Sequence, residues 1–433
     1  MSGVKVGLWF GPAGRKKAIR KLRLRLVAGL NETAALRAVF EVLRRVSPVV
    51  VVGGKVALVA RHDDVVEVLE RDEDFTVAEL SATVMDRVNG PFILGMDRSE
   101  QYDREDAILE QCVRPGDLER IRAIVRQSAS DLIDAGRRDG RIDIVNGLAR
   151  VTAVRVIGSF FGVPGPDEAT MMRWMRTIFY ETFLNVTRDP GVRRAGEESG
   201  REFHSYLHRL LALRQAQVRA GGEEAPDDFF TRMVRLQLGD DPERRLSDEG
   251  ICRNIGGVVV GAVDTTSMAT THVVDQLLRR PEALAAAQAA AGDAGAMVPF
   301  VLEALRFHPI NPALARSAAR DTVLAEGSSR ERRIPQGCVV YPLLLSAMFD
   351  PLVFEDPDSF RVDRPASSYL HFGHGLHTCF GERINVVQMP ETLSALLAAG
   401  AIRRAPGRAG NVVYDGPFPD RLLVDFDAVG SSR

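Results

Sequence analysis

A glycine-rich loop with a single cysteine constrains the fold of this chain more than any other stretch. The loop reads His371-Phe-Gly-His-Gly-Leu-His-Thr-Cys-Phe-Gly381. Its three glycines let the backbone turn tightly and let another group approach the backbone closely. Cys379 is therefore a lone thiol on a sharply turning loop, and the rest of the chain has to provide the surface that this loop faces.

A thiolate on such a loop can ligate a metal, and two metal centres fit the residue types. Haem iron accepts a cysteine thiolate as its axial ligand, and a flat haem needs backbone close to its face. His371, His374, His377 and Cys379 also form the pattern H-x2-H-x2-H-x-C, which could bind zinc. A third interpretation is a buried structural cysteine in a glycine turn. Haem is favoured because it also explains a long helix that contains glycine elsewhere in the chain.

The overall composition is that of an ordinary globular protein. The chain has 433 residues, of which 45% are apolar and 26% charged, so it can bury a substantial core. Its net charge of −2 gives no reason to expect nucleic-acid binding. The cysteines at positions 112, 252, 338 and 379 lie far apart and form no C-x-x-C pair, which favours free thiols in a reducing compartment. We therefore expect a cytoplasmic protein.

The N-terminal segment, residues 1–30, is strongly basic. It carries seven basic residues between Arg15 and Arg25. The apolar run that follows, at 26–30, is too short for a signal peptide or a membrane span. We expect a solvated basic helix, with contact to an acidic membrane surface or partner as the alternative, and no transmembrane anchor.

The pattern of elements predicts one mainly helical domain over residues 1–433, with small β-sheets. Residues 49–60 read as a β-hairpin around Gly53-Gly54, and residues 98–218 read mostly as helices. Residues 80–96 show no clean periodicity and are predicted to be mostly loop. No Gly/Ser-rich or Pro-rich linker divides the chain, which favours a single domain.

The longest predicted helix covers residues 248–280. Ser247 is placed to cap its first turn and Pro281 to end it. At 1.5 Å per residue it would be about 50 Å long, enough to cross a whole domain. The segment 255–262 carries no charge and should be buried on nearly all sides. Gly261, at its middle, indicates either close helix packing or a groove for a flat cofactor and a diatomic molecule.

The cysteine loop resembles the haem-binding loop F-G-x-G-x-H-x-C-x-G of the bacterial cytochrome P-450 family. The match runs from Phe372 to Gly381 and includes Gly373. The resemblance implies that Cys379 is the axial thiolate of the iron, that backbone N–H groups bond its sulfur, and that His377 meets a haem propionate. These N–H groups would restrain the electron density that the thiolate donates.

The long helix resembles the distal motif (A/G)-G-x-(D/E)-T of the same family. Gly261 and Ala262 would border the oxygen site. Asp264 and Thr265 would form the acid and alcohol pair that delivers protons, which suits a relay into a dry pocket. Thr266 would be either a helper or a hydroxyl bonded back to its own helix.

Two further matches concern charged residues. Glu303 and Arg306 resemble the E-x-x-R pair that braces the cysteine loop, although i,i+3 ion pairs on helix surfaces look the same in sequence. The third partner of that pair falls at Ser359, so Arg361 or Arg364 would replace it. In addition, Arg316 begins a match to R-x-A-x-x-D, which makes it the expected partner of a propionate.

One departure from the family lies near residues 97–105. The family places H-x-x-x-R there, but this chain has no histidine in that stretch. Tyr102 or Gln101, together with Arg104, would replace those propionate contacts.

The resemblance implies a haem b monooxygenase that inserts one oxygen atom from O2 into a C–H bond, by hydroxylation or epoxidation. Electrons would come from a ferredoxin and a ferredoxin reductase, with Arg104, Arg114 and Arg383 as candidate docking residues. The substrate would be a lipophilic small molecule such as a terpenoid, steroid, fatty acid or polyketide intermediate. The residues expected in the substrate pocket are Phe92, Val260, Val263, Asn311, Leu314 and Phe418.

Three alternatives remain at this stage. A peroxide-driven haem enzyme would lack the acid and alcohol pair, so Asp264 and Thr265 argue against it. A haem enzyme that does not oxygenate its substrate is the second. A zinc-binding structural protein is the third.

Overall fold

Helices dominate the fold, as the sequence predicted. The computed structural model describes residues 33–185, 187–221 and 225–427, and 59% of it is helix. The basic segment at residues 1–30 lies outside the described residues, so its helix stays a prediction. The helices are α2 (Thr33–Val46), α3 (His62–Glu70), α4 (Ala78–Val88), α5 (Glu100–Gln111), α6 (Asp117–Arg138), α7 (Arg150–Val156), α8 (Glu168–Phe179), α9 (Pro190–Arg219), α10 (Phe229–Leu238), α11 (Asp248–Ala262), α12 (Asp264–Leu278), α13 (Pro281–Ala289), α14 (Ala294–Phe307), α15 (Leu344–Ala347) and α16 (Glu382–Ala398).

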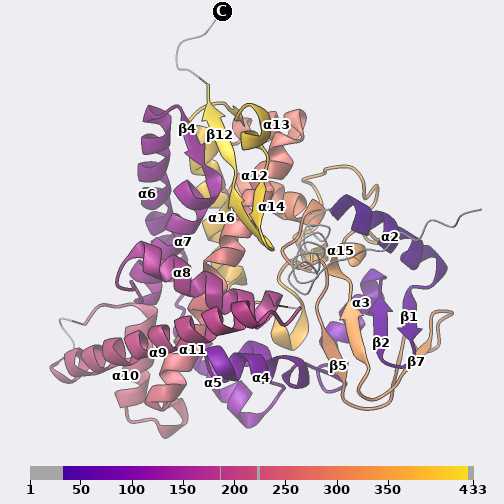
Figure 1. The fold of residues 1–433 in the computed structure, drawn as a ribbon, viewed down its shortest axis with the longest axis horizontal. Helices are drawn as coiled ribbons and strands as arrows, with labels where there is room; N and C mark the ends of the chain where they lie inside the picture. Colours follow the sequence, from indigo (N-terminus) through magenta and orange to yellow (C-terminus); the bar gives the residue numbers. More distant parts are fainter. Residues whose placement is uncertain (1–32, 186, 222–224, 428–433) are drawn as a thin grey trace, which may run out of the picture.

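The strands form small sheets: β1, β2 and β5 lie to the right of the helices, whereas β4 and β12 lie between α6 and α13 (Figure 1). One sheet has five strands in the order β1-β2-β8-β5-β3, and a second has three in the order β4-β12-β9. The strands are β1 (Val49–Val52), β2 (Val56–Val59), β3 (Phe75–Thr76), β4 (Arg141–Asp143), β5 (Arg316–Ala318), β6 (Thr322–Leu324), β7 (Arg332–Ile334), β8 (Val339–Pro342), β9 (Ile402–Arg404), β10 (Val413–Asp415), β11 (Phe418–Arg421) and β12 (Leu423–Phe426). The predicted hairpin is confirmed, because β1 and β2 pair antiparallel across Gly53 and Gly54, which have φ of +58° and +69°.

The prediction of a loop over residues 80–96 is wrong. The stretch begins inside helix α4, and only its second half is irregular, with a short turn at Ile93–Gly95. The residue before the helix, Val77, provides no side-chain cap. The carboxylate of Asp97 replaces it, since it accepts hydrogen bonds from the N–H groups of Val77 and Ala78 at 2.7 and 3.1 Å. A cap supplied from twenty residues away leaves no local signal in the sequence.

The predicted helix at 248–280 is interrupted. Ser247 caps its first turn as expected, by accepting a hydrogen bond from the Gly250 N–H at 3.0 Å. The helix then breaks at Val263, between α11 and α12. At the break the hydroxyl of Thr265 donates to the carbonyl of Gly261, which in a regular helix would accept from a backbone N–H. This bond accompanies the break but does not by itself explain it, because Thr270 and Thr271 make the same kind of bond inside α12, which stays regular.

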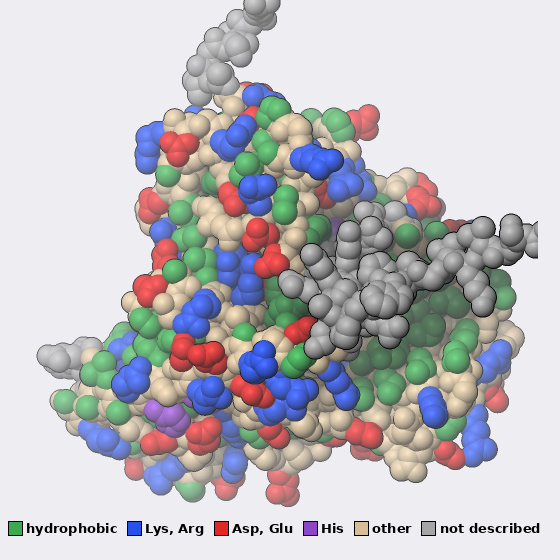
Figure 2. All heavy atoms as spheres, in the orientation of Figure 1, with side chains coloured by type: hydrophobic (Ala, Val, Ile, Leu, Met, Phe, Trp, Pro, Cys, Tyr) green, Lys and Arg blue, Asp and Glu red, His purple; other side chains and the backbone are tan. Residues whose placement is uncertain are grey.

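The core is built around α12 and α16. Helix α16 packs against α6, α12 and α14, so it runs between helices on several sides. Among the described residues one stretch, Ile144–Phe161, is long and apolar enough to cross a membrane, and 72% of it is buried inside the fold. It contributes side chains such as Ile144 and Phe160 to the two largest apolar clusters. On the face shown in Figure 2, acidic and basic side chains are interspersed rather than segregated.

Candidate active site

The cysteine loop is held in its turns by backbone contacts. The Cys379 N–H donates to the carbonyl of Phe372 at 2.8 Å, which closes the loop on itself. Gly373 and Gly375 have φ of +77° and +69°, a region that favours glycine. A Cβ on Gly375 would lie 2.4 Å from the carbonyl oxygen of Leu69, so glycine is also required there by space. The loop is thus fixed against α3.

The sulfur of Cys379 sits where helix α16 begins. Burial raises the pKa of this thiol, while hydrogen bonds from the N–H groups of Gly381 and Glu382 act in the opposite direction. A Cβ on Gly381 would be in ordinary contact with the sulfur, at 3.6 Å, but would lie only 3.0 Å from Nδ2 of Asn385. Such N–H donors stabilise a thiolate, and a bound metal ion favours the deprotonated form further.

There is open space beside Gly261, close to the break in the long helix. A Cβ built on Gly261 would meet no atom within 4 Å, although Gly261 lies between buried residues of α11. Thr266, three residues after Val263, donates its hydroxyl to Oδ1 of Asn385 at 2.9 Å. Asn385 in turn donates to the carbonyl of Gly381 at 3.0 Å. This chain of bonds places the break beside the cysteine loop.

Asp264 is buried next to two arginines. Its side chain is 1% exposed, and its Oδ1 lies 3.1 Å from Nε of Arg176 and 3.3 Å from Nε of Arg150. Its Oδ2 is buried and has no hydrogen-bond partner among the described residues. Asp264 and Thr265 are adjacent in the chain, but their side chains do not bond each other. The predicted acid and alcohol pair is therefore present as neighbours, each held by a different partner.

A second group of predicted residues gathers at the edge of the site. Burial lowers the pKa of Arg316 to about 10, and no carboxylate of the described residues forms an ion pair with it. Burial also lowers the pKa of His377 to about 4, with the charge of Arg316 acting in the same direction. Nδ1 of His377 is buried without a partner. A buried guanidinium and an unpaired imidazole nitrogen suit an anionic group such as a haem propionate.

Tyr102, one of the candidates to replace the missing histidine, lies beside His377. Its ring packs edge-on against His377, with centroids 6.0 Å apart, and its hydroxyl donates to the carbonyl of Leu376 at 2.7 Å. Gln101 bonds to Glu105 instead. Arg104 is exposed, and no hydrogen bond or ion pair of the described residues involves it. Of the three candidates, the structure brings only Tyr102 to the site, and it leaves Arg104 outside.

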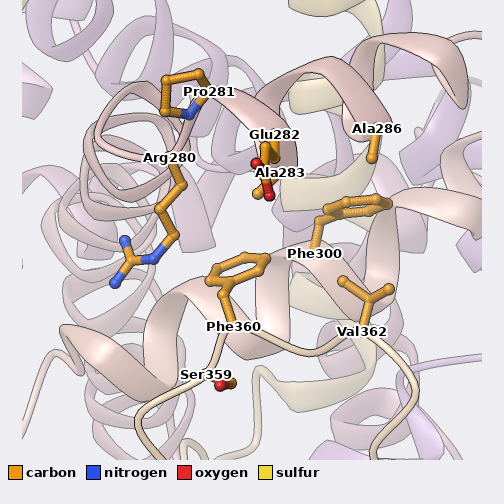
Figure 3. A pocket seen from close by; sticks show the side chains of 9 residues that line it. All are labelled: Arg280, Pro281, Glu282, Ala283, Ala286, Phe300, Ser359, Phe360 and Val362. Carbon is orange, nitrogen blue, oxygen red and sulfur yellow. The ribbon is translucent and has the colours of Figure 1, made fainter.

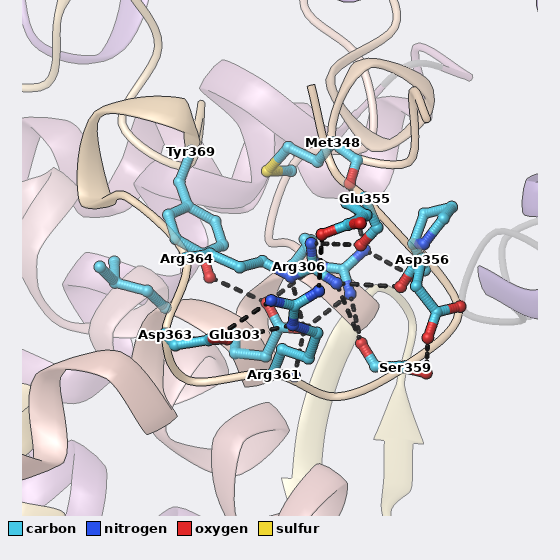
Figure 4. A network of polar contacts seen from close by, with 12 residues as sticks. Glu303, Arg306, Met348, Glu355, Asp356, Ser359, Arg361, Asp363, Arg364 and Tyr369 are labelled. Atoms are coloured by element: carbon cyan, nitrogen blue, oxygen red, sulfur yellow. Dashed lines mark hydrogen bonds and ion pairs between the residues drawn. The ribbon is translucent and has the colours of Figure 1, made fainter. Parts of the chain in front are cut away.

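Glu303 and Arg306 form a fully buried pair rather than a surface pair. Both side chains are 0% exposed and meet through two hydrogen bonds of 2.7 and 2.9 Å. Arg306 also donates to the carbonyls of Pro357 and Ser359, at 2.7 and 3.1 Å (Figure 4). The pair therefore ties α14 to the segment that precedes the cysteine loop, as the sequence predicted.

The third partner of this pair is Arg364. Its Nε lies 3.4 Å from Oε1 of Glu303, while Arg361 offers Glu303 only its backbone N–H, at 3.0 Å. Tyr369 adds a hydrogen bond to Oε2 of Glu303 at 2.8 Å. Ser359 takes part through its carbonyl (Figure 4). Between the two replacements that the sequence left open, the structure favours Arg364.

An apolar hollow lies beside α11. Phe92 and Val260, two of the residues expected in the substrate pocket, line it, and the side chain of Phe92 fills the space next to Gly257. Its full lining is Met85, Asn89, Phe92, Ile178, Thr182, Phe183, Gly257 and Val260.

The other predicted pocket residues lie elsewhere. Val263 is fully buried at the helix break. The ring of Phe418 packs against the ring of Tyr180, with centroids 5.4 Å apart. Asn311 is exposed and Leu314 packs partly against the sheet core, so neither lines this hollow.

A larger hollow of about 620 Å³ opens near α13 and α14 (Figure 3). Residues that line it include Arg280, Phe300 and Phe360. None of its lining residues belongs to the cysteine loop or to the helix break. It therefore has no part in the site around Cys379.

Sequence reasoning missed several residues of the site. Arg150 and Arg176, which hold Asp264, come from α7 and α8, and nothing in their local sequence distinguishes them from other arginines. Asn385 was missed as well, although a polar residue on the buried side of a helix that follows the ligand loop is a usable signal. Its contact with Thr266 also answers an open question, since the Thr266 hydroxyl crosses to another helix instead of bonding back to its own.

Taken together, these residues fit a haem. The loop offers a thiolate with N–H donors to its sulfur, the helix break offers open backbone, and Arg316 with His377 offers partners for carboxylates. The zinc interpretation of the loop loses support, because His371 bonds to the carbonyl of Leu302 and His374 to Glu70.

The burial of Glu303 leads to a prediction about stability. We expect Glu303→Gln to lower the free energy of unfolding by about 3 kcal/mol or more, because it leaves buried guanidinium groups without their counter-charge. Glu119→Gln is the matched control, since Glu119 has the same spacing to Arg122 but is 77% exposed, and should change stability by less than about 0.5 kcal/mol. Urea unfolding measures both. Equal losses in the two variants would contradict the bracing role.

His371 leads to a prediction about pH. Burial lowers its pKa to about 4, whereas an unfolded histidine titrates near 6.5. Between these values the unfolded chain binds a proton that the folded chain does not, so stability is complete above about pH 6.5 and falls as the pH drops toward 4. Unfolding midpoints across this range should fall less steeply for His371→Gln. His374→Gln, on the exposed part of the same loop, should keep the slope of the parent protein.

Sequence comparisons agree with this site. The sequence model of the cytochrome P-450 family matches residues 35–293 and 297–399. Cyclomarin C epoxidase CymV of Salinispora arenicola is 25% identical over 276 residues, which are 64% of this chain and 65% of that relative. Mycinamicin IV hydroxylase/epoxidase of Micromonospora griseorubida is 27% identical over 370 residues, covering 82% of this chain and 83% of that relative.

Solved structures agree on the fold. The crystal structure of CalO2 matches with a TM-score of 0.78 at 22% identity, over 91% of this chain and 96% of that one. A mutant of P-450 EryK in complex with erythromycin B matches with a TM-score of 0.75 at 23% identity, over 93% and 99% of the two chains. The family match covers most of the sequence. In the structure, the residues of the haem-binding motif lie on one tightly turned loop around Cys379. The chain belongs to the cytochrome P-450 family of haem-thiolate monooxygenases.

Proposed function

We propose that this protein inserts one oxygen atom from O2 into a C–H bond of a lipophilic small molecule, by hydroxylation or epoxidation, with haem b held by Cys379. The proposal rests on the surroundings of the Cys379 sulfur, which accepts hydrogen bonds from the N–H groups of Gly381 and Glu382 at the start of α16. Family membership supports the same assignment. When bound, the haem supplies the activation of O2. We also propose that the whole chain works as a single domain.

The chain's own residues would orient the cofactor and control its proton supply. Arg316 and His377 would bind the propionates, with Tyr102 packed against the imidazole to hold its orientation. Gly261 and Ala262 have little or no side chain and would therefore leave room for O2 beside the backbone. Phe372, Gly373 and Gly381 would shape the loop around the sulfur.

Asp264 is the residue we propose for proton transfer. Its Oδ1 is held by Arg150 and Arg176, which leaves Oδ2 unpartnered in a buried position. A carboxylate oxygen without a partner can accept a proton and pass it on to the hydroxyl of Thr265. Rotation of the Thr265 hydroxyl away from Gly261 would complete the relay.

The hollow beside α11 has a free volume of only about 10 Å³, so a substrate would have to displace side chains to enter it, but its apolar lining supports a lipophilic substrate. Of its eight lining residues only Asn89 and Thr182 are polar, so an apolar substrate would lose little by leaving water. The relatives that act on cyclomarin C and mycinamicin IV, by their names, support a large secondary metabolite. Phe92 and Val260, which line this hollow, would contact the substrate.

Electrons would come from a ferredoxin and its reductase in the cytoplasm. The four cysteines are free, and three of them are buried, which suits a reducing compartment. Arg383, beside the cysteine loop, pairs with Glu110, and Arg114 pairs with Asp227 at 3.2 Å. Of the three proposed docking residues, Arg104 is the one without an ion pair among the described residues, so its charge would be available to an acidic partner.

The reduced, carbon-monoxide-bound absorption spectrum tests the ligand. We expect a strongly red-shifted Soret band that Cys379→Ser abolishes, because the shift depends on the thiolate. Cys338→Ser is the matched control, since this buried cysteine lies in the sheet core and should leave the band unchanged. A band that survives in Cys379→Ser would overturn the assignment. Zinc without iron in metal analysis would instead support the structural alternative.

Turnover of Asp264→Asn tests the proton relay and the use of O2. With reductase and O2 we expect product formation to fall at least tenfold while the carbon-monoxide spectrum is unchanged. Asp420→Asn is the control, because Asp420 is an exposed carboxylate 3.9 Å from the same Arg176. Peroxide alone that sustains full activity, or turnover without O2 uptake, would contradict the proposal.

A further inference from the structure

Two histidines and a glutamate converge between α9 and α11. His204 and His208 are four residues apart on α9 and therefore share one face of that helix. Glu249, in the first turn of α11, faces them. One ligand atom from each of the three side chains lies within 4.8 Å of the others, and Nε2 of His208 lies 3.2 Å from Oε2 of Glu249.

The orientation of His204 is that of a metal ligand. Its ring donates a hydrogen bond to the backbone of Asn89, and its Nε2 is buried without a partner. Nδ1 is therefore the nitrogen that carries the proton, which leaves a lone pair on Nε2. A backbone carbonyl that fixes one ring nitrogen in this way is the usual companion of a metal-ligating histidine.

His208 has a similar second contact. Its Nδ1 lies 3.7 Å from Sγ of Cys252, on the opposite side of the ring from Glu249. This contact leaves Nε2 to face Glu249 and His204. Cys252 is buried and sits on the far side of the imidazole, so it orients the ring and does not belong to the ligand set.

The geometry points to a zinc site in which Nε2 of His204, Nε2 of His208 and a carboxylate oxygen of Glu249 bind the ion and water takes the fourth position. Zinc bonds of about 2.0–2.2 Å place two ligands of a tetrahedron about 3.4 Å apart. The 3.2 Å between His208 and Glu249 already matches that edge. The two remaining pairs, His204–His208 and His204–Glu249, lie within 4.8 Å, so each has to close by at most about 1.4 Å, which rotation of the exposed His208 and Glu249 side chains can supply.

The ligand chemistry selects the ion. Two neutral imidazoles and one carboxylate suit zinc, whereas Mg²⁺ and Ca²⁺ prefer shells made mostly of oxygen. The side chains of His208 and Glu249 are 46% and 61% exposed, so an ion can enter from solvent.

The site would join three parts of the fold. His204 belongs to α9, Glu249 to α11, and Asn89, which fixes His204, follows the end of α4. Asn89 also donates to the carbonyl of Arg253 at 2.9 Å and lines the apolar hollow. Bound zinc would therefore fix one wall of that hollow and stabilise the folded state.

Equilibrium dialysis of the haem-loaded, chelator-stripped enzyme against zinc chloride, followed by metal analysis, tests the site. We expect one zinc per chain, a thermal midpoint that rises by a few degrees with zinc, and no competition from excess Mg²⁺. His208→Ala and Glu249→Gln should each weaken zinc binding at least tenfold. Both positions are exposed, so these variants should remain folded.

Two further variants act as controls. His374→Ala removes an exposed histidine that pairs with Glu70 at 2.9 Å without a third ligand nearby among the described residues, and it should leave zinc binding unchanged. Cys252→Ser should retain the zinc, since its sulfur is outside the ligand set. A parent enzyme that binds no stoichiometric zinc would overturn the proposal. So would zinc binding that survives both His208→Ala and Glu249→Gln.

Discussion

A buried ion pair fixes the position of the cysteine loop, and the site depends on that position. Glu303 and Arg306 are completely removed from water, so every one of their polar atoms needs a partner inside the protein. Those partners are the carbonyls of the segment before the loop, the guanidinium of Arg364 and the hydroxyl of Tyr369. If the segment moved, it would leave charges unpaired in a medium of low dielectric constant. The pair therefore costs energy to break, and this cost holds the thiol of Cys379 at one place.

On the opposite side of the site, the long helix is interrupted at Val263. It divides there into α11 and α12, and beside this division the hydroxyl of Thr265 donates to the carbonyl of Gly261. A Cβ on Gly261, beside the division, would meet no atom within 4 Å. Asp264, the first residue of α12, lies against Arg150 and Arg176, whose charges offset that of its buried carboxylate. Open space and a charge-paired carboxylate thus occur together at one break in the helix.

The sequence predicted what depends on local pattern and missed what depends on distant partners. The thiol loop, the Ser247 cap and the hairpin at Gly53-Gly54 are encoded by residues next to one another, and the structure contains all three. Helix α4 was missed because its cap, Asp97, lies twenty residues away.

The charged residues show the same limit of prediction from the sequence. Glu119 and Glu303 have the same spacing to an arginine, yet one is 77% exposed and the other is not exposed at all. Burial depends on which elements cover a helix face, and spacing along the chain does not contain that information. The choice between Arg361 and Arg364, and the identity of the arginines beside Asp264, needed the tertiary structure for the same reason.

The two halves of the site are also joined directly, through Asn385. Its side chain accepts from Thr266 on α12 and donates to the carbonyl of Gly381, whose N–H bonds the sulfur of Cys379. A shift of α12 would therefore pull on the peptide that carries one of the N–H groups at the sulfur. Because such groups restrain the electron density of a thiolate, the position of α12 and the donor strength of Cys379 are coupled. The side-chain amide of Asn385 therefore links the position of helix α12 to the electron density on the sulfur of Cys379.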